Sequence, residues 1–79
     1  MKVLLFGIAR EITGHEMITV PTEMNLDTVA DLRSWLGKQY PLLQGLSSLA
    51  VAVDKTYTDD DHKLSQDSEI ALIPPVSGG

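Results

Sequence analysis

The chain contains no cysteine, which removes a whole class of chemistry from a protein of 79 residues. Without thiols it can form no disulfide, no thiolate metal site and no cysteine nucleophile. A core of this size is marginal, and small domains usually rely on disulfides, metals or partner subunits. The two histidines, His15 and His62, lie far apart in sequence. We therefore expect no metal site and look for a partner protein. If the chain handles sulfur, the chain terminus is the obvious place to carry it.

Basic residues are also scarce. Six Lys and Arg residues stand against 11 Asp and Glu residues, and the formal net charge is −5. An acidic surface repels phosphates and anionic lipid headgroups, so we expect neither a nucleic-acid nor a membrane partner. The apolar run at residues 3–6 is too short for a signal peptide or a membrane span. These features predict a cytoplasmic protein whose partners present basic surfaces.

The hydrophobic pattern predicts one α+β domain over residues 1–73, followed by a flexible tail at 74–79. The runs that read as strands are Val3–Ile8, Met17–Val20, Leu49–Val53 and Glu69–Ile73. One helix is expected from Val29 to Lys38 or Gln39. Two N-terminal strands, one helix and two further strands favour the β-grasp fold, a mixed sheet wrapped over one main helix. In that fold the first and last strands form a central parallel pair.

The start of the helix has a clear signal. Thr28 and Asp31 have the spacing of a capping box, in which each side chain accepts a hydrogen bond from the other residue's backbone amide. Pro41 sets the end of the helix. Beyond it, residues 42–49 read as an irregular connection with a possible short helical turn. Asp54–Thr56 reads as a turn, and Thr58–Lys63 reads as a charged, solvated loop without the Gly and terminal Glu of a calcium-binding loop.

The C-terminal tail carries the most specific chemical signal. Pro74 and Pro75 end the last strand and keep the chain extended, because proline fixes φ and cannot donate to a sheet. Gly78 and Gly79 have no side chains, so the end of the chain can enter a narrow channel in another protein. A free carboxylate is a poor acyl donor and must first be activated, for example as an acyl-adenylate. Attack of sulfide on that adenylate would give a thiocarboxylate.

The activation must come from a partner, because the sequence contains no phosphate-binding loop. The alternative interpretation of the tail is an inert or cloning-derived extension. A strand that leads into Pro-Pro-Val-Ser-Gly-Gly, in a chain without cysteine, favours the functional interpretation.

The sequence resembles the small subunits of molybdopterin synthase over nearly its whole length. The most specific matches are the opening strand and the ending. The matching segments are 3–7 with Arg10, Glu11 and Gly14, then Thr28-Val29 with Leu32-Arg33, Ala52-Val53-Asp54, Asp61-His62 with Leu64, Glu69-Ile70-Ala71, and 74–79. The chain departs from the family at Ile73, where an aromatic residue is common.

The resemblance implies a carrier subunit that is not itself a catalyst and binds no cofactor. In that family an adenylyltransferase related to ubiquitin-activating enzymes uses ATP to activate the terminal glycine. The thiocarboxylate then donates sulfur to cyclic pyranopterin monophosphate in the large synthase subunit, within a heterotetramer. Carried over to this chain, Gly79 bears the sulfur, and the inserted tail is Pro74, Pro75, Val76, Ser77 and Gly78. The candidate interface residues are Phe6, Arg10, Glu11, Leu72 and Ile73.

Three other functions are consistent with parts of the sequence. A thiazole-pathway sulfur carrier would use the same tail chemistry, but such carriers are generally shorter and lack the Arg10-Glu11 opening and the Pro-Pro-Val-Ser lead-in. A ubiquitin-like protein modifier would join Gly79 to substrate lysines and give covalent ladders. A binding module with an inert tail would be ignored by adenylating enzymes.

Overall fold

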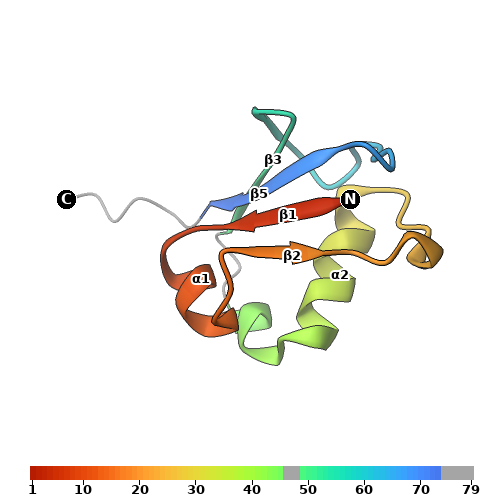
Figure 1. Ribbon diagram of the computed structural model, residues 1–79. Helices are drawn as coiled ribbons and strands as arrows, with labels where there is room; N and C mark the ends of the chain where they lie inside the picture. Colours follow the sequence, from red (N-terminus) through yellow and green to blue (C-terminus); the bar gives the residue numbers. More distant parts are fainter. Residues whose placement is uncertain (46–48, 74–79) are drawn as a thin grey trace.

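The structure is a computed structural model, and it describes residues 1–45 and 49–73. Its elements, in chain order, are β1 (Lys2–Leu5), α1 (Gly7–Thr13), β2 (Met17–Thr19), η1 (Thr22–Met24), α2 (Val29–Gln39), η2 (Pro41–Gly45), β3 (Ala50–Val53), β4 (Thr56–Thr58) and β5 (Glu69–Ile73). The strands form one five-stranded sheet, and α2 covers one of its faces (Figure 1).

The sheet has the strand order β2-β1-β5-β3-β4, so the last strand of the chain is its central strand. β1 pairs with β5 in parallel, from Lys2 opposite Glu69 to Leu5 opposite Leu72. All other neighbours are antiparallel. This mixed sheet over one main helix is the β-grasp fold, and the predicted parallel pair of first and last strands is confirmed.

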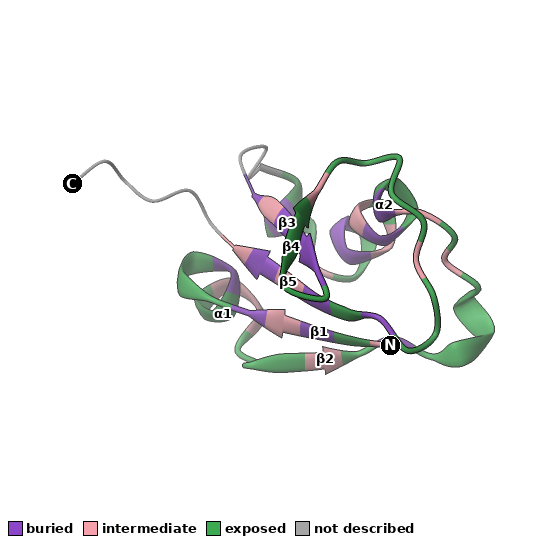
Figure 2. Cartoon of the chain, turned by 90° about the horizontal axis from the view of Figure 1, so that it is seen from above, coloured by how far each residue is buried: buried purple, intermediate pink, exposed green. Residues whose placement is uncertain are grey.

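The core lies between the sheet and α2. Side chains alternate between the two faces of a strand, so every second residue faces the helix. On the sheet the inward residues are Val3, Leu5, Val51, Val53, Ile70 and Leu72, and α2 contributes Val29, Leu32 and Leu36. Figure 2 shows these positions in purple along the middle strands and on one side of α2. Each fully buried side chain of this kind stabilises the fold by about 1.5–3 kcal/mol relative to its exposed state.

The first turn of α2 has all of its backbone amides satisfied. The predicted capping box is present, with Thr28 and Asp31 exchanging hydrogen bonds. The amides of Val29 and Ala30 donate to the carbonyls of His62 and Asp60 at 3.0 Å each. The charged loop therefore exposes its side chains, as expected, while its backbone closes the end of the helix.

The predicted strand over Val3–Ile8 is too long. β1 ends at Leu5, and α1 begins at Gly7. Gly7 has a φ of 54°, a left-handed conformation that glycine adopts without the usual penalty, and it turns the chain out of the sheet. Ala9 is then buried in the core, and Gly14 closes the short helix in a left-handed conformation.

The predicted order of elements also omits one strand. Asp54 and Lys55 make the expected turn, but the chain then returns as β4, which pairs with β3. Both turn residues have positive φ, 50° and 71°, as tight hairpin turns require. Neither is glycine, so the usual hairpin signal is missing from the sequence.

Candidate functional site

The C-terminal end of β5 is the part of the fold from which the predicted tail departs. β5 lies between β1 and β3, and its last residue, Ile73, pairs with Ala50. A strand with a partner on each side is held firmly in position. The tail residues singled out in the sequence lie outside the described residues: Pro74, Pro75, Val76, Ser77, Gly78 and Gly79.

The sheet face opposite α2 carries a row of apolar residues that crosses all five strands. Leu4 pairs with Met17 on one side and with Ala71 on the other. Ala71 pairs with Ala52, which in turn pairs with Tyr57. Tyr57 is 67% exposed and Met17 is 44% exposed. We call this row, from Met17 to Tyr57, the outer-face row; no element of the described chain covers its two ends.

Phe6 and Ile73 extend the outer-face row toward the end of β5. They follow Leu5 and Leu72, which are opposite each other in the parallel pair. Phe6 has an extended backbone, so its side chain alternates to the face opposite that of Leu5. It is 48% exposed. Two of the predicted interface residues therefore lie together beside the point where the tail begins.

Leu72 does not lie on that surface. It is only 2% exposed and faces α2 within the core. As a direct interface residue it is therefore a wrong prediction. The pattern of β5 gave two apolar sets, Ile70 with Leu72 and Ala71 with Ile73, and alternation alone does not say which set faces inward.

Arg10 and Glu11 are both exposed on α1, next to the end of β1. Arg10 makes its ion pair with Glu16 rather than with Glu11, at 2.6 Å between Nη2 and Oε1. Both partners are more than half exposed, and such pairs contribute little to stability. With Gly7 and Gly14 these three charged residues line a shallow polar groove. They remain available for contact with a partner.

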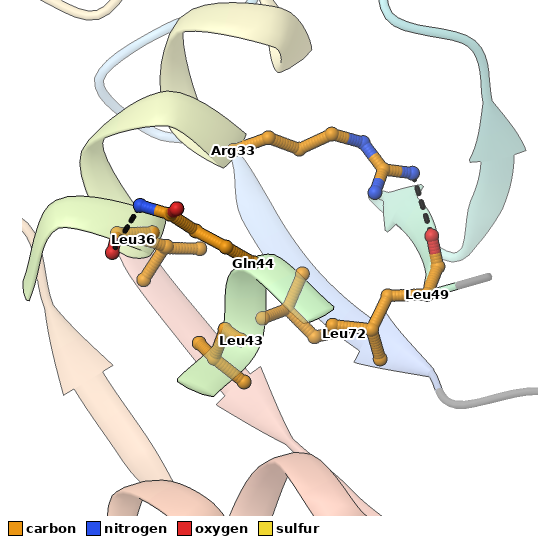
Figure 3. Close-up of a pocket in the computed structure, with 7 residues that line it drawn as sticks. Arg33, Leu36, Leu43, Gln44, Leu49 and Leu72 are labelled. Carbon is orange, nitrogen blue, oxygen red and sulfur yellow. Dashed lines mark hydrogen bonds between the residues drawn. The ribbon is translucent and has the colours of Figure 1, made fainter. Parts of the chain in front are cut away.

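An apolar pocket lies on the inner side of the same end of β5. It has a volume of about 180 Å³. Figure 3 shows the residues that line it, which come from α2, η2, the start of β3 and the end of β5: Arg33, Leu36, Gly37, Leu43, Gln44, Leu49 and Leu72.

Shifted pKa values occur where α2 begins, on the side of the molecule opposite the C-terminal end of β5 (Figure 1). Backbone amides of Thr28 and Asp27 donate to the Asp31 carboxylate and lower its pKa. The ion pair with Asp27 raises the pKa of Lys63. Neither group lies at the C-terminal end of β5. Both pKa shifts arise from hydrogen bonds and ion pairs around the first turn of α2.

Within 1–45 and 49–73, no three His, Cys, Asp or Glu side chains are grouped so that they could hold a metal ion. None of the helices in that part of the chain has the length and apolar character needed to cross a bilayer.

The sequence interpretation gave Tyr57 and Met17 no place in an interaction surface. Tyr57 was missed because β4 was missed. Met17 was interpreted as a packing or surface residue with no partner role. The strand register places both residues. Once β3 and β4 are paired through the turn at Asp54, Tyr57 lies beside Ala52 on the outer face, and the pairing of β1 with β2 places Met17 beside Leu4.

A family model described as the ThiS family matches residues 3–79. This chain belongs to the ThiS family. Among curated relatives of this ThiS chain, the molybdopterin synthase sulfur carrier subunit of Caenorhabditis elegans is 37% identical and covers 100% of this chain and 96% of its own length. The subunit of the same name from Dictyostelium discoideum is 36% identical, covering 99% and 94%. That of Escherichia coli is 34% identical, covering 100% and 99%.

Solved structures agree on the fold of this ThiS-family chain. The small archaeal modifier protein SAMP1 of Haloferax volcanii superposes with a TM-score of 0.82 at 25% identity, covering 99% of this chain and 97% of its own. A complex of subunits 1 and 2 of the molybdopterin-converting factor of Helicobacter pylori contains a chain with a TM-score of 0.69 at 26% identity, covering 99% and 96%. The β-grasp assignment is thereby supported independently of the register.

Proposed function

We propose that this chain is the sulfur carrier subunit of a molybdopterin synthase, and that Gly79 is the group that carries the sulfur. The observation that supports this most strongly is the end-to-end match to sulfur carrier subunits from an animal, an amoeba and a bacterium at 34–37% identity. The match includes the Gly-Gly terminus, because the family model extends to residue 79.

The proposed chemistry follows from the terminus and from what the chain lacks. An adenylyltransferase partner would use ATP to convert the Gly79 carboxylate to an acyl-adenylate, with release of pyrophosphate. Attack by a sulfide equivalent would then expel AMP and leave a thiocarboxylate. The sulfur of that group would bond to cyclic pyranopterin monophosphate, and water would then cleave the bond between the sulfur and the Gly79 carbonyl carbon, which leaves the sulfur on the pterin and regenerates the carboxylate. With no cysteine in the sequence, no other group of this chain is suited to hold transferable sulfur.

The outer-face row is the surface we assign to the large subunit. The converting-factor complex of Helicobacter pylori pairs a chain of this fold with a second subunit. On this chain, Met17 and Tyr57 offer exposed apolar area on the two edge strands of the sheet, and Phe6 offers it beside β5, the strand that leads to the tail. A partner that covers this face would receive the tail at its edge. We further propose a heterotetramer of two small and two large subunits, working in the cytoplasm.

The test is fragment mass spectrometry after incubation with the host adenylyltransferase, ATP and a sulfur donor. We expect one oxygen of Gly79 to be replaced by sulfur in C-terminal fragments. Fragments are needed because oxidation of Met1, Met17 or Met24 gives nearly the same intact mass. A chain lacking Gly79 should stay folded and unmodified. An unmodified terminus, with an enzyme that is active on a control carrier, would overturn the proposal.

The proposed surface has its own matched pair of variants. Tyr57→Ser should weaken binding to the large subunit by about tenfold or more, because exposed aromatic residues commonly carry much of an interface's binding energy. Leu42→Ser is the control, since Leu42 is 72% exposed but lies on η2, away from the sheet. Equal affinities of the two variants, measured by calorimetry, would remove the outer-face row from the interface.

A protein-modifier function is the second candidate, and the likeness to SAMP1 is the observation that favours it. It predicts covalent ladders that react with antibody against this chain in cell extracts and disappear when Gly79 is deleted. The substrate that accepts the sulfur distinguishes a thiazole-pathway carrier from a molybdopterin synthase carrier. The thiazole carrier's thiocarboxylate would support thiazole formation and would not restore molybdopterin synthesis with the large subunit.

A further inference from the structure

Arg33 joins three separate parts of the fold. It lies on α2, and its Nη2 donates to the carbonyl of Leu49 at 2.6 Å, as Figure 3 shows. Its Nε lies 2.8 Å from Oδ1 of Asp60, close enough for an ion pair although not in hydrogen-bonding alignment. The Nε atom is itself buried. The Asp60 side chain is 61% exposed and that of Arg33 is 33% exposed, so the ion pair is partly solvated and contributes little. The directional link is the hydrogen bond from Arg33 to the Leu49 carbonyl.

The Leu49 carbonyl lies next to the backbone that pairs with the end of β5. Leu49 precedes Ala50, the first residue of β3, and Ala50 is the register partner of Ile73. Ile73 is the last residue of β5, immediately before the segment that carries Gly79. A fixed Leu49 therefore fixes Ala50, and Ala50 fixes the backbone from which the tail departs.

Between α2 and the C-terminal end of β5, side-chain packing is less complete than in the rest of the core. The pocket of about 180 Å³ lies among Leu36, Leu49 and Leu72, between α2 and the end of β5. The pocket is partly open to solvent, so the side chains that line it make fewer contacts with other protein atoms on that side. Arg33 spans the rim of this pocket (Figure 3). Its hydrogen bond supplies a directional link where packing is incomplete.

We propose that Arg33 is a positioning residue for the C-terminal tail: by holding Leu49 and Asp60 it sets the direction in which Ile73 leaves the sheet. This inference rests on the proposed function, in which a partner must receive the tail. Arginine is suited to this position because its planar fork presents several donors at once, whereas lysine presents a single point of charge. The residue does not touch the reacting atoms and acts through Leu49 and Ala50.

The test combines Arg33→Met with deletion of Gly78 and Gly79 in a double-mutant cycle, with the affinity for the large synthase subunit as the readout. In the full chain we expect Arg33→Met to weaken binding by about three- to tenfold, because a smaller fraction of molecules presents the tail in the competent direction. In the chain lacking the two glycines it should change affinity by less than about twofold, because Arg33 is proposed to act through the tail and the two changes should therefore be coupled and not additive.

Hydrogen exchange supplies a readout that does not depend on the partner. Arg33→Met should speed exchange of the backbone amides in peptides that cover 49–53 and 69–73. Lys63→Met is the matched control, because it removes a cation that ties the same loop to Asp27, away from the end of β5. Arg33→Lys keeps the charge and most of the stem, so it should restore part of the lost affinity and guard against a variant that does not fold.

Three results would contradict the inference or the function on which it rests. Equal loss of affinity in the full and shortened chains would show a general effect of Arg33 and overturn the inference. Unchanged exchange at 69–73 would overturn it as well. If deletion of Gly78 and Gly79 leaves the wild-type affinity intact, tail insertion itself fails, and the proposed function is rejected before Arg33 is considered.

Discussion

The two ends of α2 are held in place by different means. At its start, a capping box and the carbonyls of His62 and Asp60 satisfy the first-turn amides. At its other end, Gln44 donates to the carbonyl of Gly37 at 2.9 Å beside an apolar pocket. The start is closed by a saturated polar network, and the end by single bonds across incomplete packing. The less closely packed end is the one next to the exit of β5, where a carrier has to present its terminus.

The largest effect that tests this difference comes from the core. Leu32→Ala and Leu36→Ala remove the same atoms from successive turns of α2, and each should cost about 2–5 kcal/mol of unfolding free energy. Leu36 lines the pocket and already lacks some neighbours, so its loss should be smaller by about 1 kcal/mol. Urea denaturation measures both. A larger loss at Leu36 would mean that the pocket end is as well packed as the other.

An intermediate effect is expected from the polar groups that close each end. Thr28→Ala removes the helix cap and should cost about 1 kcal/mol. Gln44→Ala removes one part-buried hydrogen bond made by an exposed residue, and should cost about half as much. Thermal unfolding of the two variants gives the comparison directly. If Gln44→Ala is the more damaging change, the end of α2 depends on its single bond more than its start depends on the cap.

The smallest effect is a pH dependence confined to the start of α2. The folded pKa of Asp31 lies below its ordinary value of 3.8. Stability from this carboxylate is therefore fully present above the unfolded pKa and is lost as pH falls through the folded pKa. Asp31→Asn cannot titrate, so its unfolding free energy should fall less steeply with acidification below about pH 4. Parallel curves for the wild type and the variant would contradict the assigned hydrogen bonds.

Local signals allowed part of the fold to be predicted. The capping box and Pro41 bounded α2 correctly, because cap chemistry acts within a few residues. The parallel pair of β1 and β5 was predicted from the order of the elements, which indicated the β-grasp fold, and the register confirms it. α1 was missed because residues 3–8 form one apolar run, and only the backbone of Gly7 shows where the strand stops. A single glycine inside an apolar run does not predict that a helix begins there.

Some residues of the candidate site could also be predicted from local sequence, and others could not. The tail was predictable because its chemistry is written in consecutive residues, and it remains a prediction here. Phe6 and Ile73 were found through the family resemblance, and the register brings them together. Tyr57 depends on a hairpin turn with no glycine, and Arg33 depends on a contact to Leu49, sixteen positions away. Contacts of that range follow from the assembled fold and have no local sequence signature.

The central position of β5 bears on how the chain is made. On a ribosome the last strand emerges last, so β1 and β3 have no common neighbour until synthesis is almost complete. The outer-face row crosses β5 at Ala71, between Leu4 and Ala52, and is continuous only after that strand has docked. A partner that binds this row across all five strands would therefore bind only chains in which β5 has docked.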